Sequence, residues 1–202
     1  MRRLPILPTI IVALAVATMI GLGLWQLRVR LPQKEAQLAQ LAANPSRPAV
    51  PFPRSPDDSL LFRASVAECA QVTGITRAGA GNAGYRLIAT CLTPGGGAPI
   101  KVQLGTTRDP TKMVEWGGGV VRGWISHAPD QTPLIATLFR AAPKEMLLVA
   151  AEPAARLTAN SRPDIGLVPN NHLAYAGQWF FFAAVAALIY LVALRRRLAS
   201  RA

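Results

Sequence analysis

The residues with the clearest chemical potential begin an uncharged run near the C-terminus. His172 is followed, at intervals of three or four residues, by Tyr175, Trp179 and Ala183. In an α-helix this spacing places the four side chains on roughly one side. A neutral imidazole is a common axial ligand of haem iron, and a surface of aromatic and alanine side chains would accept a porphyrin. The pattern predicts a haem-binding helix face with His172 as the candidate iron ligand.

A second group of polar and aromatic residues ends an uncharged run near the N-terminus. It comprises Trp25, Gln26, Arg28, Arg30 and Lys34. Its cations could neutralise haem propionates, and two antiparallel spans would bring both groups to the same membrane surface. The alternative is simple: tryptophan and tyrosine occur at any membrane interface, and a lone histidine there usually forms a hydrogen bond. These residues alone leave haem binding and interfacial anchoring both open.

Both groups flank segments that are predicted to cross a membrane. Residues 4–27 and 173–194 contain no charge, and each run exceeds the roughly 20 residues that span about 30 Å of hydrocarbon. The first run is too long for a signal-peptide core of about 7–15 residues, and no small-residue cleavage site precedes Trp25. We therefore expect an uncleaved anchor at 4–27 and a second transmembrane helix at 173–194.

The basic residues set the expected orientation. Lysine and arginine total 22 against 10 acidic residues, for a net charge of +12, and much of the excess lies at the chain ends, at Arg2, Arg3, Arg195, Arg196, Arg197 and Arg201. This placement argues against a nucleic-acid partner. Basic residues beside a span resist translocation, so the same placement favours two cytoplasmic termini, with residues 195–202 as a basic tail. Arg28, Arg30 and Lys34, at the other end of the first span, oppose that orientation. We expect a multi-pass protein of the bacterial inner membrane, or of the mitochondrial inner membrane in a eukaryote, with lipid as a partner.

The middle of the chain is expected to form an extracytoplasmic, mainly β domain. Residues 28–59 combine an amphipathic helix at 32–43 with a proline-rich linker. Residues 60–155 alternate apolar and β-branched residues with glycine, which is typical of a small sandwich or barrel. The expected strands are 62–66, 68–75, 85–92, 100–104, 120–126, 134–138 and 146–151. Residues 156–172 would connect this domain to the second span.

The two cysteines fit a hairpin in this domain. If 68–75 and 85–92 pair around a loop centred on Ala80, Cys69 faces Cys91. Facing residues of antiparallel strands lie about 4.5–5.5 Å apart, which suits a disulfide in an oxidising compartment. Two buried free thiols are the alternative. A metal site does not fit, because one pair of cysteines lacks the spacing of metal ligands.

Other motifs give no catalytic site. Residues 79–84 match the dinucleotide-binding pattern G-x-G-x-x-G, but they join two predicted strands rather than a strand and a helix. The sequence has no G-x-S-x-G or H-E-x-x-H motif, and its two histidines offer little for hydrolytic catalysis. We do not expect an enzyme. Small residues spaced by four, at Ala13, Ala17 and Gly21 and at Ala183 and Ala187, permit close helix contact between the spans or with a partner.

Two motifs resemble the surfeit-locus family of cytochrome c oxidase assembly proteins. The first is Pro8-Thr9 followed by GLGLWQL at 21–27 and then Arg28, Arg30 and Lys34. The second is PNNHLAYAGQWF at 169–180. Between them, VVRGWI at 120–125 is similar to the family's strand ending in RGW, and Phe62-Arg63 is similar to its first strand. Glu68-Cys69 departs from the glycine of typical members, and the β domain is shorter than theirs.

The resemblance implies a non-enzymatic membrane chaperone that helps supply haem a to oxidase subunit I, with His172 as the haem ligand. It implies that Trp25, Gln26, Tyr175 and Trp179 are either pocket residues or packing residues. It also implies that Arg122 and Trp124 stabilise the β domain. The alternative is an accessory or interaction subunit of a respiratory membrane complex that binds no haem. A membrane-anchored ligand-binding module is a third possibility, and it would require a conspicuous apolar pocket in the β domain.

Overall fold

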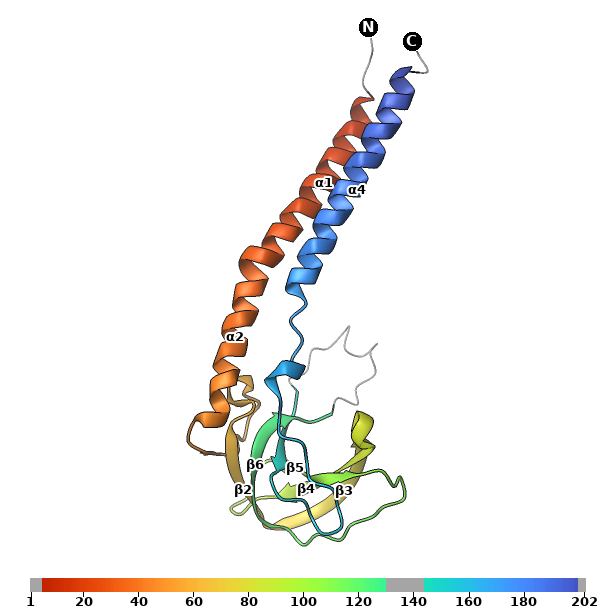
Figure 1. Cartoon of the computed structure of the whole chain (residues 1–202). Coiled ribbons are helices and arrows are strands. Elements are labelled where there is room, and N and C mark those ends of the chain that lie inside the picture. Colours follow the sequence, from red (N-terminus) through yellow and green to blue (C-terminus); the bar gives the residue numbers. More distant parts are fainter. Residues whose placement is uncertain (1–4, 130–143, 200–202) are drawn as a thin grey trace. The chain divides into compact units, whose positions relative to one another are not determined.

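The computed structural model describes residues 5–129 and 144–199 (Figure 1). They form two compact units: a helical unit of residues 1–38 and 168–202, and a β unit of residues 39–167. The predicted strand at 134–138, as well as Arg2, Arg3 and Arg201, lie outside the described residues.

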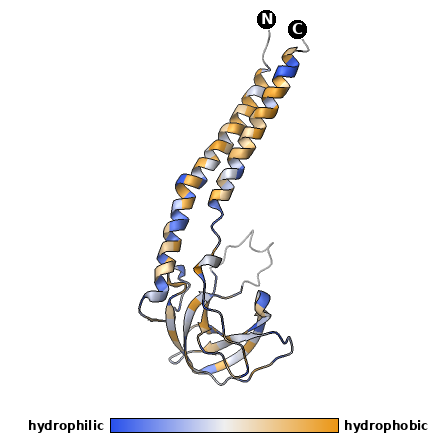
Figure 2. Cartoon of the chain, viewed as in Figure 1, coloured by the Kyte–Doolittle hydropathy of each residue, from blue (hydrophilic) through white to orange (hydrophobic). Residues whose placement is uncertain are grey.

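The helical unit contains two long apolar helices. These are α1, Ile6–Trp25, and α4, His172–Ala199. Both are long and apolar enough to cross a membrane by length and composition, and apolar residues cover most of each helix (Figure 2). A π-turn, Gln26–Arg30, follows α1 and leads directly into α2, Leu31–Ala43.

The helices α1 and α4 pack side by side and antiparallel, so that the start of α1 lies beside the end of α4 (Figure 1). Residues spaced alternately by three and four are less exposed than their neighbours and form the contact: Thr9, Val12, Val16, Met19, Gly23 and Gln26 of α1 and its π-turn, and His172, Ala176, Trp179, Ala183, Ala186 and Tyr190 of α4. This is the spacing of a left-handed helix pair. The hydroxyl groups of Thr9 and Tyr190 bond at one end of the contact.

The contact includes the predicted Ala183 of α4 but not the small residues that the sequence pattern predicts on α1. Ala13, Ala17 and Gly21 of α1 are exposed, whereas Ala183 of α4 is buried. Gly23 supplies the close approach instead, because a Cβ atom there would lie 2.7 Å from the ring of Phe180.

Seven strands in the described part of the β unit form one mixed sheet. They are β1, Val50–Pro51; β2, Ala64–Cys69; β3, Gln71–Gly79; β4, Tyr85–Leu92; β5, Ile100–Thr107; β6, Gly119–His127; and β7, Met146–Ala150. Their order is β1-β2-β6-β7-β5-β4-β3, with parallel pairing for β1–β2 and β5–β7 and antiparallel pairing elsewhere. Only Ala70 separates β2 from β3, although these strands lie at opposite sides of the order. The sheet must therefore bend so that the end of β2 lies beside the start of β3.

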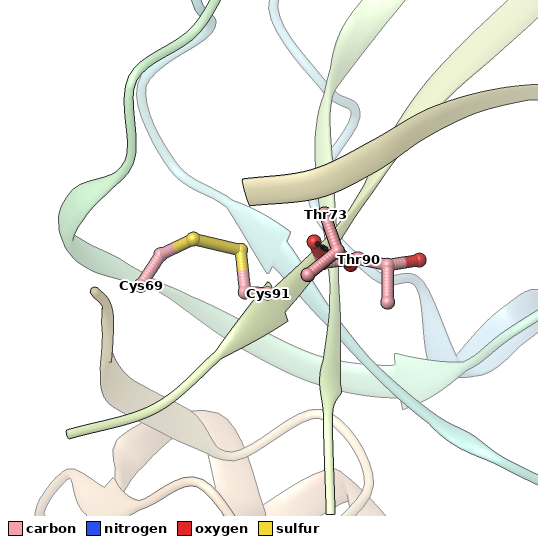
Figure 3. The surroundings of a disulfide bond; sticks show 4 residues. All are labelled: Cys69, Thr73, Thr90 and Cys91. Carbon is pink, nitrogen blue, oxygen red and sulfur yellow. Dashed lines mark hydrogen bonds between the residues drawn. A yellow bond between two sulfur atoms is a disulfide. The ribbon is translucent and has the colours of Figure 1, made fainter. Parts of the chain in front are cut away.

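The disulfide joins the end of β2 to β4 (Figure 3). Cys69 and Cys91 are bonded, with 5.2 Å between their Cα atoms, and both are buried in the main apolar core. The backbone N–H of Ala70 also donates to the carbonyl of Leu92, at 2.9 Å. Beside the disulfide, the Thr73 hydroxyl donates to the Thr90 carbonyl, at 3.1 Å (Figure 3).

The predicted cysteine pair is confirmed, but the predicted hairpin register is wrong. In the β3–β4 ladder Gly79 faces Tyr85, so the loop is centred on Asn82 rather than Ala80, and Val72 faces Cys91. Cys69 belongs to β2, where it faces Gly119 of β6. The register differs because a 3₁₀ turn at Gly81–Ala83 and a positive φ of 83° at Gly84 close the loop. The strand expected at 68–75 is also broken, at Ala70.

The proline-rich segment is more ordered than the linker that we expected. Val50–Pro51 forms β1, and Phe52 packs against the main core. Asn44 is fully buried, and its side-chain amide donates to the carbonyl groups of Ser59 and Leu61 at 2.7 and 2.8 Å. These bonds hold the end of α2 to the segment before β2 and satisfy the buried amide.

The start of the predicted connector is fixed to the sheet. Thr158 forms a backbone bridge with Thr106 of β5. The buried Asn160 accepts from Gln103 at 2.6 Å and donates to the carbonyl of Ala150 at 2.9 Å. Arg86 donates to the other side of Gln103, and its partial burial lowers the pKa of its guanidinium.

The RGW segment has a packing role in β6. Gly123 faces Ala150 of β7, and a Cβ atom at Gly123 would overlap the carbonyl oxygen of Val149. The Trp124 ring lies under the guanidinium of Arg162, whose Cζ is 5.4 Å from the ring centroid. The contact of Trp124 agrees with its predicted stabilising role, whereas the side chain of Arg122 is exposed and its predicted role stays a prediction.

Candidate functional site

The candidate site begins with a hydrogen bond between the two helices of the helical unit. His172 is the first residue of α4, and Gln26 is the first residue of the π-turn after α1. The Nδ1 atom of His172 lies 2.8 Å from the Oε1 atom of Gln26. Both residues belong to the helix contact, at the end opposite the Thr9–Tyr190 pair.

This bond fixes which nitrogen of His172 carries the proton. An amide oxygen can only accept a hydrogen bond, so Nδ1 must be the donor and must be protonated. In the neutral ring, Nε2 then carries the lone pair. Among the described residues, no hydrogen-bond partner occupies Nε2. A metal-binding histidine has the same arrangement, since its second ring nitrogen usually donates to an oxygen acceptor, and so does a histidine that only joins two helices by a hydrogen bond.

A buried acceptor lies two residues before His172. The Oδ1 atom of Asn170 is buried and has no hydrogen-bond partner among the described residues. Leaving such an atom unpaired costs about 1–3 kcal/mol. A bound group that carries a hydrogen-bond donor would recover this energy. Sequence reasoning missed Asn170 as a site residue, although the polar sequence PNN directly before an apolar helix marks the position.

The predicted aromatic residues differ in their surroundings. Trp179 is half-buried in the helix contact, whereas the side chains of Tyr175 and Trp25 are 49% and 46% exposed. Among the described residues, only Gln26 forms a hydrogen bond with the His172 ring. The structure therefore joins His172 with Gln26 and leaves Tyr175 and Trp25 on the outer surface of the helices.

The predicted cations have partners of their own. The guanidinium Cζ of Arg30 lies 5.6 Å from the centroid of the Trp25 ring. The ammonium of Lys34 donates to the side-chain oxygen of Gln37, at 3.2 Å. The exposed Arg30 and partly exposed Lys34 are both accessible to an anionic group.

The β unit offers no comparable site among its described residues. A cavity of about 450 Å³ there is lined by the charged Arg122 and Glu152 as well as by apolar residues, so it is not the conspicuous apolar pocket that the ligand-module hypothesis requires. No cluster of three or more potential metal ligands occurs in the described part of the chain. His127 is paired with Asp58, whose Oδ1 lies 2.8 Å from its Nε2.

A sequence comparison places this site in a known family. The SURF1 family profile matches residues 13–184. The chain belongs to the SURF1 family. The matched region contains Gln26, His172 and the whole β unit. Searches of curated proteins and of solved structures gave no match.

Membership of the SURF1 family limits the function to a class. SURF1-family proteins are membrane-associated assembly factors, are not known as enzymes, and are associated with the assembly of cytochrome oxidase. The resemblance in the sequence motifs is thereby confirmed at the level of the family.

Proposed function

We propose that this protein holds haem a at the outer face of the membrane, on its way to subunit I of cytochrome c oxidase. The observation that carries the proposal is the bond from His172 Nδ1 to Gln26, because it leaves the Nε2 lone pair available. Haem would supply the iron, and His172 Nε2 would be its protein ligand. The protein would act as a membrane chaperone and would catalyse no reaction.

The remaining site residues would hold the porphyrin. Trp25, Tyr175 and Trp179 offer aromatic surface at the same end of the helix pair, and Arg30 and Lys34 are the candidate partners of the propionates. Gln26 would orient the His172 ring and maintain its tautomer. The unpaired Oδ1 of Asn170 would accept a hydrogen bond from a donor group of the ligand. The donors and acceptors present therefore fit a haem.

The proposal places α1 and α4 across the inner membrane of a bacterium, or the mitochondrial inner membrane in a eukaryote. Both termini would be cytoplasmic or matrix-facing, and the β unit would be extracytoplasmic. The disulfide supports an oxidising compartment for the β unit, since such bonds persist there. The basic residues Arg195, Arg196 and Arg197 support a C-terminus on the inner side.

The test is an absorption spectrum of the full-length protein purified from cells that make haem a. The wild type should carry a haem band, and His172→Gln should lose it without a change in protein abundance. His127→Gln is the matched control, because His127 is the second histidine and lies in the β unit. Gln26→Leu should retain haem more weakly, since the imidazole loses its orienting acceptor.

The alternative function is an accessory or interaction subunit of a respiratory complex that binds no haem. The bond between His172 and Gln26 also favours this function, because a hydrogen bond between two helices stabilises their packing without any ligand. If the wild type carries no haem, or if His172→Gln keeps the parental spectrum, the haem proposal is wrong and the accessory function takes its place.

A further inference from the structure

The π-turn after α1 brings together two residues that an α-helix would separate. The backbone N–H of Leu31 donates to the carbonyl of Gln26, five residues earlier. In an α-helix, residues five apart point in different directions, because 3.6 residues complete a turn. The i→i+5 pattern of the π-turn brings such residues closer to register. Arg30 accordingly lies over the ring of Trp25, 5.6 Å from its centroid.

Both members of this pair are accessible. The Trp25 side chain is 46% exposed, and Arg30 is exposed. Among the described residues, Arg30 forms no ion pair with an acidic side chain, and the first acidic residue in the sequence is Glu35. A guanidinium that stacks on an indole still presents the N–H groups at its edge to an outside acceptor. The pair is therefore an unneutralised cation on an aromatic support.

The position of the pair at the end of an apolar helix indicates which anion is available. Tryptophan rings at helix ends lie at the depth of the lipid headgroups. If α1 crosses the membrane with its N-terminus inside, Arg28, Arg30 and Lys34 lie on the translocated side, where basic residues oppose insertion. A bound anion would offset this penalty. The anion always present at this depth is the phosphate of a phospholipid.

We propose that Trp25 and Arg30 form a binding site for the phosphate of an anionic phospholipid in the outer leaflet. The guanidinium edge would contact the phosphate oxygens through two parallel N–H donors, a geometry that lysine cannot reproduce. The indole would hold the guanidinium flat and would itself lie among the headgroups. While the lipid is bound, Arg30 is not available to a haem propionate, and of the two candidate propionate partners Lys34 remains. The site requires the membrane placement of α1 but does not depend on haem binding.

The experiment measures lipid binding to the haem-free, full-length protein by native mass spectrometry in detergent, with phosphatidylglycerol or phosphatidylcholine added. Arg30→Lys keeps the charge but removes the paired donors, and Trp25→Leu removes the support. Each should weaken the tightest phosphatidylglycerol binding by about two- to fivefold, the equivalent of one exposed cation–π contact. Arg28→Lys is the matched control, because Arg28 lies in the same π-turn but not over the Trp25 ring. It should change binding less than twofold.

Three outcomes would overturn the proposal. Equal effects of Arg28→Lys and Arg30→Lys would indicate diffuse attraction between a basic segment and an anionic surface. Equal binding of phosphatidylglycerol and phosphatidylcholine by the wild type would exclude a site for anionic lipid. If Arg30→Lys leaves lipid binding unchanged but weakens haem retention, Arg30 binds a haem propionate rather than a lipid phosphate. Circular dichroism and the intact disulfide serve to verify the fold of each variant.

Discussion

Removal of the disulfide should destabilise the β unit by an amount that the structure allows us to calculate. Cys69 and Cys91 are separated by 22 residues. The chain-entropy relation for a loop of this length gives about 11 cal/mol/K, or about 3.4 kcal/mol at 25 °C. The Cys69→Ala/Cys91→Ala variant also loses two buried sulfur atoms, at about 0.8 kcal/mol each if they count as methylene-sized groups. The total is about 5 kcal/mol, which is comparable with the whole stability of a small domain.

The assay is equilibrium urea unfolding of the full-length protein in detergent, followed by tryptophan fluorescence. Three samples separate the two contributions: the oxidised wild type, the wild type with a reductant present throughout, and the double alanine variant. The reduced wild type should lose only the loop-closure part, because its sulfur atoms remain. If the reduced protein unfolds within about 1 kcal/mol of the oxidised protein, the bend of the sheet at Ala70 does not depend on the disulfide, and our reasoning is wrong.

Three further predictions concern a glycine in the sheet, a hydrogen-bonded carboxylate and the membrane topology. Gly123→Ala should destabilise the β unit by about 2 kcal/mol in the same urea assay, because the new Cβ would overlap the Val149 carbonyl. Gly74→Ala is the control and should change stability little, because a Cβ atom at Gly74 would meet open space. The hydroxyl and backbone N–H of Thr111 donate to the Asp109 carboxylate and lower its pKa. The carboxylate therefore stabilises the fold at pH values above its unfolded pKa, and this stability is lost as the pH falls through its folded pKa. Asp109→Asn should make the free energy of unfolding less sensitive to acid in that range. Alkaline phosphatase fused near residue 110 should be active, and the same enzyme fused after Arg201 should be inactive; the reverse pattern would contradict the proposed topology.

The sequence predicted the strands best where alternation and glycine agree. The ranges expected for β4, β6 and β7 agree with the observed strands to within one residue at each end, whereas the range expected for β5 begins at the observed residue and ends three residues early. The register of β3 against β4 was not predictable, because it depends on a 3₁₀ turn and on the positive φ of Gly84, which the glycine-rich sequence permits but does not require. The ordered position of Asn44 was not predictable either, because its side chain bonds to the carbonyl groups of Ser59 and Leu61, which are distant in the sequence.

The helix contact was hidden from the sequence for a different reason. Almost every residue of α1 and α4 is apolar, so hydrophobic periodicity cannot distinguish a lipid-facing side chain from one in the contact. The distinguishing signals are polar: Thr9, Gln26, His172 and Tyr190 mark the two ends of the contact, and they become informative only once they are paired. The sequence placed Gln26 and His172 at the same membrane surface but did not predict the hydrogen bond between them.

The distance along the chain between these paired residues has a consequence for biosynthesis. Gln26 and His172 are 146 residues apart, and Thr9 and Tyr190 are 181 residues apart. At about 5–20 residues per second, ribosomes need roughly 7–30 s after making Gln26 before His172 exists. During this interval the amide and hydroxyl groups of α1 have no partner on α4, while the cysteines, only 22 residues apart, can already pair. The helix pair is therefore the last part of the fold that can assemble, and a nascent chain that stops before α4 would leave α1 without its partner helix.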